Sequence, residues 1–247
     1  MLRKIGLFYL SLIIGTIAHA QDMSGREAIS EADMPYMLNY SNLDNPYGWV
    51  PLSNKDIVLQ QLIVPGKTWE GVHSHPGHQM FVHIKGGYWT GKMGEEVMYS
   101  HELSPAGEMG WMGHIPLDDR HDSGNTGDEP IELIYITSKR GIPLTPETEE
   151  VATVYPNIAL DVKLEDELML AQRGTINPGE WTGVHDRPGN QLYILVKGGT
   201  LSERDASGSE SSVTQVDGAA KWLDAANGIN LGNTGDTPID YVLVTFK

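Results

Sequence analysis

The chain has 247 residues, no cysteine, and a formal charge of −16 from 17 basic and 33 acidic residues. This negative charge repels nucleic-acid phosphates and anionic lipids, so we expect neither a nucleic-acid nor a membrane partner. The absence of cysteine excludes disulfides, thiolate nucleophiles and cysteine-based zinc sites, so stability must come from an apolar core.

Residues 1–20 are typical of an export signal. Two basic residues precede an apolar run over residues 5–17, and the small-x-small sequence Ala18-His19-Ala20 follows. The run is shorter than the ~18 apolar residues of a membrane span, so we expect cleavage before Gln21 rather than insertion. The mature protein is then periplasmic or secreted, without a membrane anchor.

Short strands and tight turns follow along most of the chain. Residues 21–45 are polar and weakly patterned, which predicts either a flexible lead or an arm laid across another domain. Beyond them, runs of β-branched and aromatic residues alternate with Pro-Gly, Gly-Gly and Asn-Thr-Gly-Asp turns, a pattern typical of an all-β barrel or sandwich. The predicted strands include residues 58–64, 80–84, 131–137, 192–196 and 241–246.

An internal repeat sets the predicted domain organisation. Three sequence blocks occur twice: residues 69–73 return at 181–185, residues 79–87 at 191–199, and residues 124–131 at 232–239. Self-similarity at this long period predicts two homologous domains, over residues 46–140 and 161–247. The stretch between them, residues 141–160, contains three prolines and an acidic cluster, which is typical of a linker.

The first repeat contains a candidate metal site. Alternate residues of a strand face the same side, so His73 and His75 share one face, and Gln79 opens the strand after a predicted Pro-Gly turn. His121 offers a third imidazole. Three imidazoles and one oxygen suit a divalent cation such as Zn, Mn, Fe or Ni. The alternatives are that His78 replaces Gln79 as a ligand, or that the segment is only a polar hairpin rich in histidine.

This segment resembles the first sequence motif of the cupin superfamily. In that motif a glycine precedes His-x-His, a glutamate follows after three or four residues, and a glycine follows six residues later. Residues His73, His75, Gln79 and Gly86 fit this spacing, while the leading Gly66 lies one residue farther out than expected. Glutamine in place of glutamate removes one negative charge, which would leave a bound metal more electrophilic and less tightly held.

A second cupin motif follows in order. It matches Gly110, Pro116, His121 and Asn125, with Asp118 where glycine is usual. The resemblance covers residues 50–140, and the repeat extends it to the C-terminus. It implies an RmlC-like double-stranded β-helix barrel in each half, hence a bicupin, with the metal ligands at His73, His75, Gln79 and His121. A similar His/His/Gln/His set is found among cupins that resemble uronate ring-opening enzymes.

Three further residues of the first repeat are candidates for the site. His83 shares strand parity with Gln79, so we expect it either as an acid/base group inside the barrel or as a hydrogen-bonded core histidine. Phe81 and Trp89 are expected to line the substrate pocket, although packing alone also explains large aromatic side chains.

The second repeat carries different residues at the ligand positions: His185, Arg187, Gln191 and Ile229. One imidazole remains, and neither guanidinium nor isoleucine can bind a cation, so we expect no metal there. The second barrel then either supports the first, or forms an anion pocket in which Arg187 holds a carboxylate beside His185 and Gln191.

These features predict a metal-dependent enzyme that acts on a small oxygen-bearing substrate, an organic or sugar acid. Lyase, isomerase or ring-opening chemistry fits a Lewis-acid metal with His83 or a hydroxide moving the proton. A cofactor-free dioxygenase and a non-catalytic module that binds a small ligand are the alternatives. A small-molecule substrate is the expected partner, and a homo-oligomer is compatible with the sequence.

Overall fold

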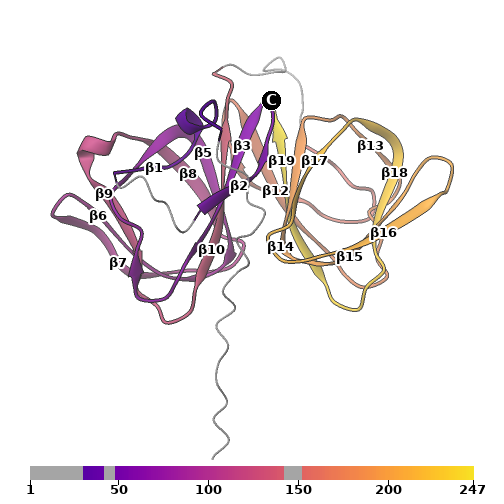
Figure 1. Ribbon diagram of the computed structural model, residues 1–247. Helices are drawn as coiled ribbons and strands as arrows, with labels where there is room; N and C mark the ends of the chain where they lie inside the picture. Colours follow the sequence, from indigo (N-terminus) through magenta and orange to yellow (C-terminus); the bar gives the residue numbers. More distant parts are fainter. Residues whose placement is uncertain (1–29, 42–47, 142–151) are drawn as a thin grey trace, which may run out of the picture.

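The computed structural model describes residues 30–41, 48–141 and 152–247, which form two β-barrels side by side (Figure 1). The predicted signal peptide, most of the predicted lead and part of the predicted linker lie outside the described residues. Within the described part, no helix is long and apolar enough to cross a bilayer. The prediction of an all-β protein with two barrels is confirmed.

Two sheets build the N-terminal barrel. One has the order β1-β5-β10-β3-β2, with β8 also paired to β5, and the other has the order β4-β9-β6-β7. The strands are β1 (Asn39–Tyr40), β2 (Gly48–Ser53), β3 (Ile57–Val64), β4 (Thr68–Trp69), β5 (His73–Lys85), β6 (Gly87–Met93), β7 (Glu96–Ser104), β8 (Met109–Ile115), β9 (His121–Asn125) and β10 (Ile131–Ser138), with the short 3-10 helices η1 (Met34–Tyr36) and η2 (Leu117–Asp119).

The C-terminal barrel repeats this plan. Its sheets have the orders β11-β12-β19-β14-β17 and β13-β18-β15-β16. The strands are β11 (Asp161–Glu165), β12 (Met169–Ile176), β13 (His185–Arg187), β14 (Gln191–Lys197), β15 (Gly199–Arg204), β16 (Glu210–Gln215), β17 (Ala220–Leu223), β18 (Ala226–Asn233) and β19 (Ile239–Phe246).

The strands between the barrels are buried on both faces, which explains their nearly continuous apolar sequences. On β10, Leu133 and Tyr135 pack inside the first barrel, whereas Ile134 and Ile136 pack against the second barrel. One apolar cluster therefore spans the two halves and includes Leu192, Ile194, Val242 and Val244 from β14 and β19. Since burying each such side chain stabilises the fold by about 1.5–3 kcal/mol, the barrels form one packed body.

The segment that begins at His73 differs from the prediction. The expected Pro-Gly turn is a β-bulge inside the single long strand β5, where the pairing with β8 shifts register between Pro76 and Gln79. Gly77 (φ 80°) and His78 (φ 46°) have left-handed backbone conformations there. A bulge re-aims the strand without ending it, so the residues on both sides of it face the barrel interior. His78 itself is exposed.

The described part of the N-terminal lead is an arm on the first barrel rather than on the second. Leu38 is buried in the core of that barrel, and its backbone N–H donates to Gln60 Oε1 at 3.0 Å. Tyr40, on β1, pairs with His73 of β5. The arm therefore reaches the candidate metal site.

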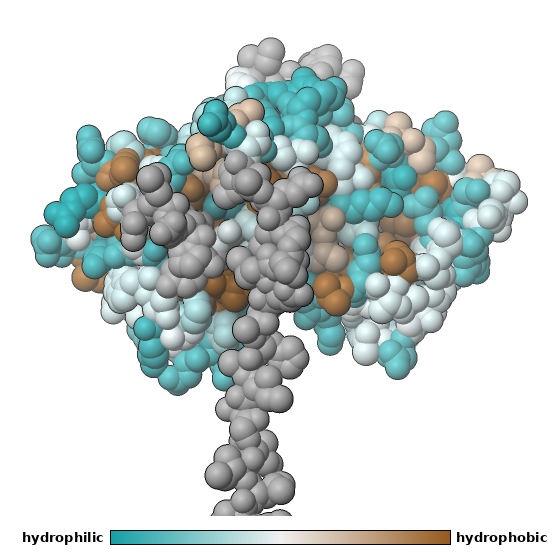
Figure 2. Space-filling model, viewed as in Figure 1, coloured by the Kyte–Doolittle hydropathy of each residue, from teal (hydrophilic) through white to brown (hydrophobic). Residues whose placement is uncertain are grey.

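Arg173, on β12, joins the two barrels by polar contacts. Its guanidinium forms an ion pair with Asp240 at 2.6 Å and donates to the carbonyl oxygen of Gly107, in the first barrel, at 3.0 Å. Gly107 has φ of +77°, and a Cβ there would overlap the guanidinium. The visible surface is mainly hydrophilic, with apolar side chains in scattered spots (Figure 2), as the negative net charge predicts.

Candidate metal centre

Three imidazoles meet inside the N-terminal barrel. His73 and His75 come from β5 and His121 from the start of β9, and one ring nitrogen of each lies within 4.8 Å of those of the other two. Their ring centroids are 4.8 to 5.1 Å apart. Among the described residues, this is the one group of three or more His, Asp or Glu side chains that can converge on a cation.

Hydrogen bonds set the orientation of two of these rings. His73 Nδ1 donates to the carbonyl oxygen of Gly71 at 2.8 Å. His75 Nδ1 lies 2.9 Å from Gln79 Oε1 and must donate to it, because the amide nitrogen of Gln79 is engaged by Thr137 at 2.9 Å. Both rings therefore keep a lone pair on Nε2, the nitrogen that a metal would take.

Gln79 lies beside the three imidazoles, buried, with its oxygen already accepting from His75. It therefore orients a predicted ligand, and its own ligation of a metal stays a prediction. The second barrel, which lacks the three imidazoles, keeps the hydrogen bond between glutamine and threonine: Gln191 Nε2 donates to Thr245 at 3.0 Å. The glutamine–threonine pair thus exists without a metal site.

The chemistry of the donors fits a divalent cation. Burial lowers the pKa of His75 to about 3 and that of His121 to about 4, and it lowers the pKa of His73 as well. The rings are therefore neutral at physiological pH, as metal ligands must be. His75 Nε2 is buried without a hydrogen-bond partner, a cost that coordination of a cation would remove.

A cavity of about 100 Å³ adjoins the cluster, and His121 is part of its wall. Phe81, His83 and Trp89 line this cavity. Substrate contact by Phe81 and Trp89, and acid/base chemistry by His83, stay predictions. Burial lowers the pKa of His83 to about 4, and its Nδ1 has no partner. His83 is thus a buried, neutral imidazole in the cavity wall, and its choice between an acid/base role and a core role stays a prediction.

Glu70 also lines the cavity, although it is not among the candidates predicted from the sequence. It directly follows β4 and is buried. Its Oε2 accepts a hydrogen bond from the Tyr40 hydroxyl at 2.9 Å. Tyr40 in turn packs its ring against His73, with centroids 5.1 Å apart. The sequence carries one signal for it: the repeat has Thr182 at the position matching Glu70, so the carboxyl is specific to the first barrel.

The second barrel lacks the cluster. His185 keeps the orientation of its counterpart, with Nδ1 2.9 Å from the Gly183 oxygen, but the residue that pairs across from it is the buried Ile229. Arg187 already donates to Glu203 at 3.2 Å and to the Asp224 carbonyl at 2.7 Å.

Gln191 of the second barrel donates its amide N–H groups to Thr153 at 2.7 Å and to Thr245 at 3.0 Å. The anion pocket of Arg187, His185 and Gln191 therefore stays a prediction. The Arg187 guanidinium already pairs with the Glu203 carboxylate.

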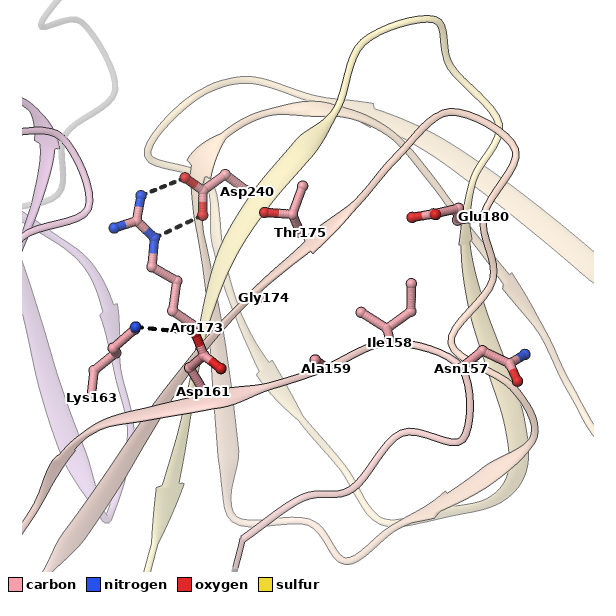
Figure 3. Close-up of a pocket in the computed structure, with 10 residues that line it drawn as sticks. All are labelled: Asn157, Ile158, Ala159, Asp161, Lys163, Arg173, Gly174, Thr175, Glu180 and Asp240. Carbon is pink, nitrogen blue, oxygen red and sulfur yellow. Dashed lines mark hydrogen bonds and ion pairs between the residues drawn. The ribbon is translucent and has the colours of Figure 1, made fainter.

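A larger hollow of about 520 Å³ lies outside the second barrel, around Arg173 and Asp240 (Figure 3). Four of its five charged side chains pair with one another: Arg173 with Asp240, and Lys163 with Asp161 at 3.2 Å. The fifth, Glu180, accepts hydrogen bonds from Asn177. The hollow holds none of the three clustered imidazoles. The first barrel is therefore the candidate functional site.

No protein-family model matches the chain, and no curated protein matches its sequence. Solved structures do match. A cupin 2 conserved barrel domain protein from Leptotrichia buccalis has a TM-score of 0.50 and 13% identity, over 81% of this chain and 88% of that one. A mutant of oxalate decarboxylase from Bacillus subtilis has a TM-score of 0.51 and 10% identity, over 78% and 69% of the two chains.

A mutant of salicylate 1,2-dioxygenase from Pseudoaminobacter salicylatoxidans is similar to the same extent, with a TM-score of 0.50 and 10% identity over 76% of this chain and 71% of that one. At such low identity these likenesses show the fold alone. Taken with the two barrels of this chain, they show that its fold is that of two cupin barrels in tandem.

Proposed function

We propose that the protein is a metal-dependent enzyme whose N-terminal barrel acts on a small oxygen-bearing molecule. The observation that carries this proposal is the unpartnered, buried Nε2 of His75 at the meeting point of three neutral imidazoles. A lone buried nitrogen is costly, so its retention favours a function for the cluster.

In this proposal each residue of the site has its own role. When bound, a divalent cation would supply Lewis acidity to a substrate oxygen. His73, His75 and His121 would hold it, Gln79 keeps His75 in the correct tautomer, and His83 stands in the cavity wall as a neutral acid/base group. Redox-neutral lyase, isomerase or ring-opening chemistry needs no further cofactor.

A dioxygenase is the second candidate. It is supported by a ligand set with three neutral imidazoles and by a mainly aromatic cavity wall. Three-nitrogen sites with open positions also suit iron and oxygen chemistry. Consumption of dissolved oxygen during turnover separates this candidate from the redox-neutral one.

One experiment tests the proposal against a non-catalytic binding module. Bound metals per purified chain are counted by mass spectrometry, and the chain is then incubated with sugar acids, dicarboxylates, hydroxy ketones and enols, with and without chelator. The proposal predicts turnover that chelator abolishes. Stoichiometric metal with ligand binding but no turnover would favour the binding module.

We also propose that the protein works outside the cytoplasm, since residues 1–20 have the pattern of an export signal. Mass spectrometry of the protein expressed from its full sequence tests this proposal. We expect a mature chain that begins at Gln21, and a chain that retains residues 1–20 in the cytoplasm would contradict export.

A further inference from the structure

A second cavity, of about 110 Å³, lies inside the C-terminal barrel. Three of its wall residues match wall residues of the first barrel's cavity in strand register. They are Tyr193, Leu201 and Leu223, which match Phe81, Trp89 and Met112. Because pockets for drug-sized ligands have volumes of roughly 300–1,000 Å³, this cavity suits a much smaller molecule.

The wall of this cavity carries two cations. Arg187 stands at the position of His75, two residues after the first histidine of each repeat. Lys221, on β17, stands at the position of Gly110 in strand register. By contrast, none of the described residues that line the first cavity is lysine or arginine. The second barrel thus has two positive charges where the first has a predicted metal ligand and a glycine.

The single carboxylate of the wall, that of Glu203, balances only one of these cations. Arg187 Nη1 donates to Glu203 Oε2 at 3.2 Å, and Arg187 Nε donates to the carbonyl oxygen of Asp224 at 2.7 Å. Lys221 forms no ion pair or hydrogen bond with a described residue. The cavity wall therefore keeps one positive charge without a counter-ion, in a chain whose net charge is −16.

One edge of the Arg187 guanidinium is open to the cavity. The side chain is only 12% exposed, and its Nη2 makes no hydrogen bond with a described residue. Nη2 is nevertheless not sealed off, so an occupant of the cavity can reach it. Unused N–H groups of a guanidinium bind a carboxylate oxygen through charge-assisted hydrogen bonds.

Much of the remaining wall is aliphatic. The side chains concerned are Leu201, Val213, Leu223 and Leu231. The hydroxyl of Ser202, also in the wall, is already bonded to Ser212 and Thr234. A hydrocarbon chain would gain by contact with these aliphatic side chains, whereas the hydroxyls of a sugar acid would lose hydration against them.

We propose that the second barrel binds a short-chain aliphatic monocarboxylate, whose carboxylate is held by Arg187 and Lys221 and whose hydrocarbon chain contacts the leucine and valine side chains of the cavity. Of the anion pocket expected from the sequence, the proposal keeps Arg187. Lys221 replaces His185 and Gln191, which do not line the cavity. The inference goes beyond the proposed function, because this site lies in the other barrel and needs no metal.

A chemical-shift titration of the ¹⁵N-labelled, zinc-loaded full chain tests the site. The probes are butyrate and butyramide, which match in size and differ in the negative charge. We expect butyrate to bind at least about tenfold more tightly, with saturable shifts at the amides of Tyr193, Leu201 and Leu223. Equal affinities of the two probes, shifts confined to the first barrel, or the absence of saturable shifts would overturn the inference.

Acetate tests the apolar part of the site. It lacks two methylene groups of butyrate, and it should bind roughly tenfold more weakly because each buried methylene contributes about 0.8 kcal/mol. An acetate affinity equal to that of butyrate would overturn the assignment of an aliphatic ligand.

Variants locate the charges that hold the carboxylate. Arg187→Gln should weaken butyrate binding at least about tenfold, and Lys221→Gln about fivefold. Because Lys221 has no partner among the described residues, Lys221→Gln keeps the test decisive even if Arg187→Gln does not fold. Lys197→Gln, at the exposed end of β14, is the matched control and should bind butyrate as the parent does. Parental affinity in Lys221→Gln, or an equal loss in Lys197→Gln, would overturn the inference.

Discussion

The side-chain oxygen of Gln79 lies 2.9 Å from Nδ1 of His75, and this hydrogen bond decides which nitrogen of His75 is free. Thr137 fixes the amide from the other side by accepting from its nitrogen at 2.9 Å. The order Thr137–Gln79–His75 therefore holds one of the three imidazoles ready for a metal. Partners of this kind orient ligands and raise metal affinity.

Replacing Thr137 with valine removes the hydroxyl that orients Gln79. We expect zinc affinity to fall about tenfold, because a misoriented amide no longer fixes the His75 tautomer. Affinity is measured by competition with a chromophoric chelator. Thr245→Val is the matched control, since it breaks the equivalent bond to Gln191 in the second barrel. Equal losses of affinity in the two variants would mean that the effect is general destabilisation.

The metal-free protein should lose stability in mild acid. Burial lowers the pKa of His75 to about 3 and those of His83 and His121 to about 4, from 6.5. The unfolded chain then binds more protons than the folded chain below pH 6.5, so the free energy of unfolding falls as the pH drops. Each histidine contributes up to about 1.4 kcal/mol per pH unit within that window.

Glu70 acts in the opposite direction. Burial raises its pKa from 4.5 to about 8, so the folded chain holds the extra proton and stability falls as the pH rises through that range. Three histidines outweigh one carboxyl below pH 6.5, which places the expected maximum near that pH. The melting temperature in chelator, followed from pH 4.5 to 8, checks this; a melting temperature that rises towards pH 4.5 would contradict it.

Substitution of Gly107 is expected to lower the free energy of unfolding by more than its left-handed backbone conformation alone explains. Gly107→Ala places a Cβ at φ of +77° and against the Arg173 guanidinium, while Gly94→Ala meets a similar φ of +59° with open space around it. A left-handed backbone costs about 1–2 kcal/mol in both variants. Urea denaturation should therefore show a larger loss for Gly107→Ala. Equal losses would mean that the contact between the barrels contributes little.

Much of the fold could be predicted because the signals are local or repeated. The duplicated blocks predicted two barrels, and the two-residue spacing of His73 and His75 predicted a shared face. His121 came from a distant segment, and the second motif placed it in register with the first. The structure brings all three imidazoles together.

Other parts of the site depend on contacts that no local pattern encodes. The sequence at Gly77 and His78 looks like a turn, because glycine and proline occur both in turns and in bulges. The structure has a bulge there, since β5 pairs with β8 on both sides of it. Glu70 gains its character from burial and from Tyr40, thirty positions away. The arm that supplies Tyr40 has too little patterning to be placed from sequence.

The metal content of three purified chains tests the central claim most directly. We expect about one divalent cation per chain in the parent protein, none in His121→Ala, and the parental value in His185→Ala, because the second barrel retains a single imidazole of the set. Circular dichroism checks that each variant is folded. Full occupancy in His121→Ala, or a loss of metal in His185→Ala, would contradict a metal centre built from His73, His75 and His121.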